Sequence, residues 1–330
     1  MFYRVRTNQY KDFLSGFKTW DQKSHAKQWL LFPENIGNLL SIDETSLSNG
    51  ELYTILTNKA CKGKKGSILA IIAGTKTSDV IVVLKKTALK RRNLVTEITL
   101  DMAANMGLIA KNCFPNAIQV TDRFHVQKLA LEALQEIRIK HRWQAIDSEN
   151  NSIEQAKETK IKYTPTTLHN GDTIKQLLAR SRHILYKNKS KWTENQNERA
   201  KFLFELYPDI EKAYGLAQEL RNVFEKTTDK IYGISRLAKW HEKVNQSGFK
   251  SFNTISRTIQ NPYQTILNYF DNRSTNMSAE SFNAKIKAFR SQFRGVRNIE
   301  FFLFRLTNIC LNFATPQVLD LIPKKPYSTT

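Results

Sequence analysis

Apolar and polar residues begin to alternate at Leu39, and the pattern predicts a β-hairpin. The segments NLLSIDETSL and ELYTILTN have strand character, and the turn residues Ser48-Asn49-Gly50 separate them. The next run, ILAIIAGTK at residues 68–76, has the length and composition of a third strand. The pattern therefore predicts a meander of three strands.

The segment that follows, SDVIVVLKK at residues 78–86, fits either a strand or a helix. Its β-branched run suits a strand, whereas Ser78 as a cap and two closing lysines suit a short helix. We interpret it as a helix, because the predicted strand EITLDM at 97–102 needs a crossover to run parallel to the first strand. A helix at 103–113 and the strand AIQVTD complete an RNase H-like order. The predicted fold class is therefore α/β, with a mixed sheet flanked by helices.

The chain on either side of this core is expected to be helical. Large apolar residues recur at helical intervals in FKTWDQKSHAKQWLLF, residues 17–32, and FHVQKLALEALQEIRIKHRW is strongly amphipathic. Residues 147–172 are polar and predict a loop or mobile arm. The predicted parts are a helical lead-in at 1–38, the first part of the core at 39–125, an all-α insertion at 126–270, and C-terminal helices at 271–330 that complete the core.

Net charge indicates the class of partner. The 330 residues include 51 Lys and Arg against 30 Asp and Glu, a formal charge of +21, which favours a polyanion such as nucleic acid. Charge that serves only solubility is the alternative. Cys61, Cys113 and Cys310 lack disulfide or zinc-site spacing. No secretory signal or long apolar run is visible, so we expect a cytoplasmic, nucleoid-associated protein.

Two aspartates occupy positions where a metal site could form. Asp43 lies inside an apolar strand, and Asp101 ends the strand expected beside it. Because neighbouring strands lie about 4.8 Å apart, the two carboxylates could share one hard metal ion. Each aspartate could instead be an ordinary turn former at the end of a strand.

A third carboxylate, Glu280, opens the predicted helix SAESFNAKIKAFRSQFRG. At 100° per residue the apolar side chains gather on one side of this helix. The opposite face carries Glu280, Asn283, Lys287, Arg290 and Arg294. A carboxylate and an amide followed by cations suit a metal ligand next to phosphate contacts. An ordinary surface helix with an apolar underside would also give this pattern.

The motif Asp122-Arg123-Phe124-His125 lies at the junction of the last strand and the long helix. Arg123 could clamp a phosphate, and His125 could donate to a phosphate or orient a water, although a structural histidine is the alternative. Asp122 competes with Asp101 as the second metal ligand. We prefer Asp101, because in RNase H-like topology its strand lies next to the first strand.

Several ordered motifs together resemble the bacterial insertion-sequence transposases of the ISL-three family. The resemblance covers nearly the whole chain from about Trp20 to Phe313. The matching motifs are Ser41-Ile42-Asp43-Glu44, Thr99-Leu100-Asp101-Met102, Asp122-Arg123-Phe124-His125-Val126, Glu280-Ser281-Phe282-Asn283-Ala284-Lys285-Ile286-Lys287 and Arg294-Gly295-Val296-Arg297-Asn298.

The resemblance implies a DDE catalytic domain with an RNase H-like fold and an all-α insertion before the glutamate. Asp43, Asp101 and Glu280 become the triad that holds two Mg²⁺ or Mn²⁺ ions. Family members usually carry an N-terminal zinc finger and helix-turn-helix, and neither precedes the core here. We therefore expect either a separately encoded DNA-recognition protein or a truncated chain.

The expected activity is two-metal cleavage and strand transfer on double-stranded DNA, at the element ends and the target, by a homo-oligomer. Lys287, Arg290, Arg294 and Arg297 would hold flanking phosphates. Trp192 and Tyr186 are either base-stacking or core residues. The alternatives are an RNase H-like nuclease or resolvase without strand transfer, and a catalytically inactive DNA-binding protein.

Overall fold

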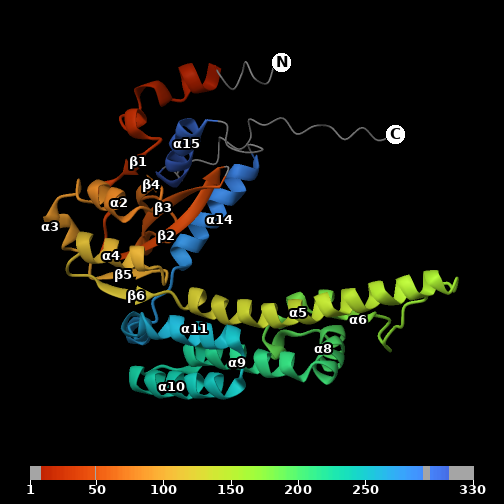
Figure 1. Ribbon diagram of the computed structural model, residues 1–330. Coiled ribbons are helices and arrows are strands. Elements are labelled where there is room, and N and C mark those ends of the chain that lie inside the picture. The colour runs from red at the N-terminus through yellow and green to blue at the C-terminus, as the bar shows by residue number, and fades with distance from the viewer. Residues whose placement is uncertain (1–8, 49, 293–297, 312–330) are drawn as a thin grey trace. The chain divides into compact units, whose positions relative to one another are not determined.

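The computed structural model describes residues 9–48, 50–292 and 298–311, and its first unit is built on one mixed sheet (Figure 1). The strand order is β1-β4-β3-β2-β5-β6, with β2, β5 and β6 mutually parallel and β3 antiparallel to both its neighbours. The strands are β1 Trp29–Leu31, β2 Leu39–Ser48, β3 Glu51–Asn58, β4 Ile68–Ala73, β5 Glu97–Leu100 and β6 Ile118–Thr121. This order confirms the predicted α/β, RNase H-like fold.

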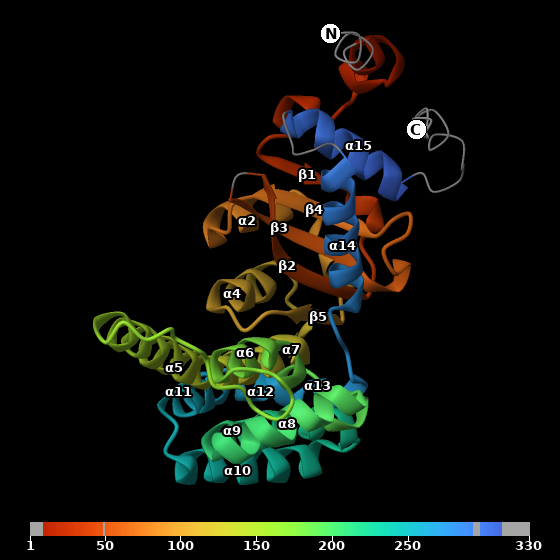
Figure 2. The same ribbon diagram turned by 90° about the vertical axis from the view of Figure 1, so that its right-hand side faces the viewer.

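Helices cover both faces of the sheet (Figure 2). On one face, Leu40, Ile42 and Ile98 form a buried core with the helices that connect the strands. On the other face, Leu47 and Ile55 pack against Phe282 and neighbouring apolar residues. The helical segments of this unit outside the N-terminal segment are η5 Lys59–Cys61, α2 Thr77–Leu84, α3 Leu89–Arg92, α4 Ala104–Cys113, α14 Met277–Gln292 and α15 Ile299–Leu311. The helical interpretation of residues 78–86 is therefore confirmed.

The predicted N-terminal helix over residues 17–32 is wrong. This segment forms the short turns η2 Phe17–Thr19 and η3 Lys23–His25 and then strand β1, with the π-helical turn η1 Tyr10–Leu14 before it and η4 Pro33–Asn35 after it. β1 pairs with the edge of β4, where Trp29 lies opposite Ile72. The strand conformation satisfies the otherwise unpaired edge of β4 and buries the side chains of Leu30 and Leu31.

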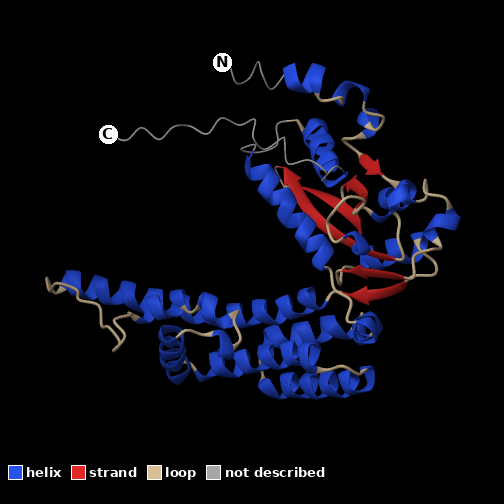
Figure 3. Cartoon of the chain, turned by 180° about the vertical axis from the view of Figure 1, so that it is seen from behind, coloured by secondary structure: helices blue, strands red, loops and turns tan. Residues whose placement is uncertain are grey.

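The second compact unit spans Arg123–Arg273, and its regular secondary structure is all helical (Figure 3). We propose that this unit is the predicted insertion. Its segments are α5 Arg123–Glu158, α6 Ile174–Arg180, α7 Arg182–Leu185, η6 Lys189–Lys191, α8 Glu194–Leu206, α9 Pro208–Lys226, α10 Lys230–Ser247, α11 Lys250–Gln260, α12 Tyr263–Leu267 and α13 Tyr269–Asn272. None of the helices in the described part of the chain is long and apolar enough to cross a membrane.

Helix α5 is longer than the sequence pattern predicts. Its 36 residues span about 54 Å, and its buried residues lie between Val126 and Arg138. The expected loop at 147–172 is therefore wrong for its first half, because the helix continues to Glu158. Polar residues such as those at 147–158 are compatible with a solvated helix, which needs no apolar stripe once its N-terminal half is packed.

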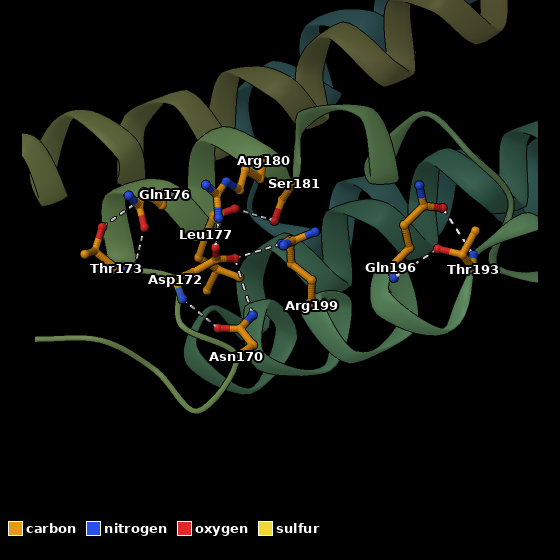
Figure 4. A network of polar contacts seen from close by, with 10 residues as sticks. All are labelled: Asn170, Asp172, Thr173, Gln176, Leu177, Arg180, Ser181, Thr193, Gln196 and Arg199. Carbon is orange, nitrogen blue, oxygen red and sulfur yellow. Dashed lines mark hydrogen bonds and ion pairs between the residues drawn. The ribbon is translucent and has the colours of Figure 1, made fainter.

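The end of the 159–173 connection is fixed by a polar network around Asp172 (Figure 4). The Asp172 carboxylate is fully buried and accepts hydrogen bonds from Arg180 and, at 2.8 Å, from Nε of Arg199. Thr173 next to it caps α6 in a reciprocal capping box with Gln176. The last residues of the predicted mobile arm are therefore tied to α6 and α8.

Candidate active site

The register of the parallel strands brings three aspartates to one edge of the sheet. Ser41 lies opposite Thr99, so two residues further along each strand Asp43 comes opposite Asp101. Leu100 lies opposite Thr121, and the Asp122 amide donates to the Leu100 carbonyl at 2.9 Å. Asp122 therefore follows next to Asp101. Residues paired across parallel strands share a face, so Asp43, Asp101 and Asp122 belong to the same side of the sheet.

Asp43 and Asp101 are half-buried, and each uses one carboxylate oxygen to accept a hydrogen bond from the amide of the next residue. Oδ1 of Asp43 accepts from the Glu44 amide at 2.8 Å, and Oδ1 of Asp101 accepts from the Met102 amide at 2.6 Å. A local hydrogen bond therefore accounts for one oxygen of each carboxylate, in mid-strand at Asp43 and directly after the end of β5 at Asp101. Such bonds also fix the orientation of each carboxylate at the sheet edge.

Helix α14 contacts this edge directly. Its Asn283 amide donates to Oδ2 of Asp43 at 2.7 Å. Phe282, Ile286 and Phe289 are buried on its underside, as the helical pattern predicts. Glu280 is exposed and lies one turn before Asn283, so it shares the face that meets Asp43.

The structure describes two of the cations that the sequence predicts to bind phosphates next to Glu280. Lys287 is exposed and Arg290 is half-buried on α14. Arg294 and Arg297 lie outside the described residues. Arg123 and His125 belong to the first turn of α5 in the helical unit, where the Arg123 guanidinium lies 4.8 Å from the centre of the Phe124 ring.

The donor chemistry of the edge suits a hard divalent ion. Aspartate and glutamate oxygens are the ligands that Mg²⁺ and Mn²⁺ prefer. Within residues 9–48, 50–292 and 298–311, however, no three His, Cys, Asp or Glu side chains are grouped closely enough to hold a metal. The carboxylates of Asp43 and Asp101 thus share an edge, with Glu280 on the adjoining helix, without forming a closed cage.

Comparison with known proteins identifies the family. The sequence profile of the ISL3 group, described as Transposase, matches residues 40–306. The chain belongs to this transposase family. It is 24% identical over 236 residues to the transposase for insertion sequence element IS1557 of Mycobacterium tuberculosis, in both strains CDC 1551 / Oshkosh and ATCC 25618 / H37Rv. That alignment covers 70% of this chain and 47% of the relative, so the chain spans about half the length of the curated relatives it matches. No solved structure matches significantly.

The helical unit of this transposase-family chain carries an arginine cluster beside an exposed tyrosine. Arg138 is buried and donates at 2.7 Å to both Gln135 Oε1 and the Leu178 carbonyl. Burial lowers the pKa of its guanidinium, and the positive charges of Arg142 and Arg182 lower it further. Exposed cations continue along the segment after α7: Lys187, Lys189 and Lys191. Such mutual repulsion is relieved when an anion binds.

Trp192 and Tyr186, which the sequence left as either base-stacking or core residues, differ in exposure. Trp192 is 9% exposed, donates through Nε1 to the Ile184 carbonyl at 3.0 Å and packs 5.4 Å from the Tyr214 ring. It is a core residue. Tyr186 is 37% exposed, beside the arginine cluster.

Sequence reasoning missed a buried ion pair on the same sheet face as the aspartates. Lys59 Nζ lies 3.2 Å from Glu97 Oε1, and both side chains are almost fully buried. Burial lowers the pKa of the Lys59 ammonium, whereas the charges of Glu97 and Asp122 raise it. The one signal for this pair in the sequence was the alternation of Glu97, Thr99 and Asp101, which places all three on one face of β5 and its end.

Proposed function

We propose that this chain is the catalytic part of a DDE-type DNA transposase that cleaves and joins DNA at insertion-sequence ends. Asp43, Asp101 and Glu280 are the proposed ligands of two Mg²⁺ or Mn²⁺ ions. The observation that carries the proposal is the meeting of β2, β5 and α14, where Asn283 beside Glu280 binds the Asp43 carboxylate. When bound, two such ions supply activation of a water or 3′ hydroxyl and stabilisation of the leaving oxygen.

The residues around the carboxylates have proposed supporting roles. Asn283 orients Asp43 through its 2.7 Å hydrogen bond. Lys287 and Arg290, on the face of α14 that carries Glu280, would hold phosphates that flank the reacting bond. We propose the same phosphate role for Arg123, His125, Arg294 and Arg297.

Asp101 rather than Asp122 is the proposed second ligand. Asp101 is half-buried, and its strand pairs directly with β2. Asp122 is fully buried, on the third strand of the parallel set, and its charge acts on Lys59. A fully buried carboxylate whose charge already acts on a buried ammonium is a poorer ligand for an added cation.

The arginine cluster of the helical unit is the proposed contact for the DNA backbone. Arg142, Arg182 and the exposed lysines that follow α7 supply positive charge without requiring a base sequence. Sequence-specific recognition of the element ends would come from a separately encoded protein or from a further part of the polypeptide, and catalysis from a homo-oligomer assembled on DNA.

The decisive experiment is Asp43→Asn, which keeps the size of the side chain and removes the charge that a divalent ion needs. With linear DNA carrying the element ends, Mg²⁺ or Mn²⁺ and any recognition protein, strand cleavage should fall by about 10³-fold or more. DNA affinity should persist, since phosphate contacts are made elsewhere. The exposed Asp21→Asn is the matched control and should cleave normally.

Three outcomes would contradict the proposal or favour an alternative. Cleavage by Asp43→Asn at the wild-type rate would contradict the metal-site assignment. Cleavage by the wild type without joining to target DNA would favour a resolvase-like nuclease. Binding without any cleavage by the wild type under these conditions would favour an inactive DNA-binding protein.

A further inference from the structure

A buried charge pair lies on the sheet face that leads to the carboxylate edge. Glu97, Thr99 and Asp101 alternate along β5 and its end, so they share one face. Lys59 Nζ contacts two of these side chains, at 3.2 Å to Glu97 Oε1 and 2.7 Å to Thr99 Oγ1. The exposed fractions of the Lys59 and Glu97 side chains are 11% and 5%. A charge pair so deeply buried contributes little net stability compared with apolar packing. Stability alone therefore does not explain why Lys59 and Glu97 lie here.

Lys59 and Glu97 both bind Ser274, where the chain re-enters the sheet unit. Ser274 is the first residue after the helical unit, and its hydroxyl is hydrogen-bonded to both Lys59 Nζ and Glu97 Oε1. Glu280 follows six positions later, and its backbone amide donates to the Asn276 carbonyl at 2.9 Å. Little chain therefore separates the held serine from the catalytic glutamate.

Gly63, four residues after Lys59, makes a second contact, with α14 itself. Lys285 Nζ donates to the Gly63 carbonyl at 2.5 Å. Gly63 has a positive φ of 71°, and an added Cβ there would lie 3.4 Å from the Ser281 hydroxyl oxygen. The segment from Lys59 to Gly63 thus contacts Ser274 before α14 and Lys285 within α14, on either side of Glu280 in the sequence.

We propose that Lys59 and Glu97, through Ser274, are positioning residues that set where Glu280 lies relative to Asp43 and Asp101. This inference rests on the proposed function, because it assumes that Glu280 is a metal ligand. The short path from Ser274 to Glu280 converts a displacement of the serine into a displacement of the carboxylate. Groups that orient a metal ligand typically change metal affinity by about 10- to 100-fold when they are removed.

The test compares Mn²⁺ binding by titration calorimetry in the full chain. Lys59→Met combined with Glu97→Gln removes both buried charges together, so neither is left unpaired. Ser274→Ala keeps the ion pair and removes only the link to α14. We expect Mn²⁺ affinity to fall about 10-fold or more in both variants, with thermal midpoints close to that of the wild type. The control is Lys27→Met with Glu300→Gln, a more exposed pair 3.7 Å apart, which should bind Mn²⁺ normally.

A background with Glu280→Gln separates this inference from the proposed function. If the pair acts through Glu280, removing it in that background should weaken Mn²⁺ binding no further, whereas in an Asp43→Asn background it still should. Unchanged affinity in Ser274→Ala and the double variant, or a full further loss in the Glu280→Gln background, would overturn the positioning role while leaving the ligand set intact. Unchanged affinity in Glu280→Gln alone would overturn both, because Glu280 would then be no ligand.

Discussion

Replacing Asp172 with alanine should destabilise the helical unit by about 2–3 kcal/mol. The carboxylate is fully buried and binds two guanidinium groups, and a hydrogen bond to a charged group contributes roughly 1.5–3 kcal/mol. The two bonds do not count equally. Arg199 is 23% exposed and should account for about 2 kcal/mol, whereas Arg180 is 54% exposed and, screened by water, should add about 0.5 kcal/mol.

Urea unfolding followed by tryptophan fluorescence would measure this loss. Trp192 is a suitable reporter, since it is buried directly before Thr193, the cap of the helix that carries Arg199. Asp172→Asn keeps the shape and should lose less than Asp172→Ala. Asp147→Ala, at an exposed site on α5, should change the free energy of unfolding by less than about 0.5 kcal/mol. A loss below about 1 kcal/mol for Asp172→Ala would refute the reasoning, because the network would then contribute no more than a surface ion pair.

Three further expectations follow from contacts in the helical unit. Combining Arg142→Ala with Arg182→Ala should weaken binding to duplex DNA and reduce its log–log salt slope by about 1.8, measured by fluorescence anisotropy, if both contact phosphates. Gly233→Ala should lower the free energy of unfolding by about 1–3 kcal/mol, because its Cβ would lie 2.7 Å from the Phe270 ring. Burial lowers the pKa of His241 from 6.5, so its stabilisation is present above about pH 6.5 and lost on acidification. His241→Gln should flatten that part of a pH–stability curve.

The sequence by itself determined the elements whose side chains follow a clear period. Alternation and the turn at Asn49-Gly50 predicted the β2–β3 hairpin, and topology alone settled the helix at 78–86. The sequence also predicted the apolar face of α14, because Phe282 and Ile286 are buried as their spacing requires. Local periodicity suffices for α14 because this helix buries one face against the sheet and leaves the other more exposed.

Tertiary structure decided the elements and contacts that depend on a distant partner. Trp29–Leu31 became a strand because the edge of β4 was open to it, and helix α5 continued past residue 147 because its packed first half nucleates the polar remainder. The link between Asn283 and Asp43 joins residues 240 positions apart, and that between Lys59 and Ser274 joins residues 215 apart. Spacing in the sequence carries no information about such pairs, because only the return of the chain after the helical unit brings them together.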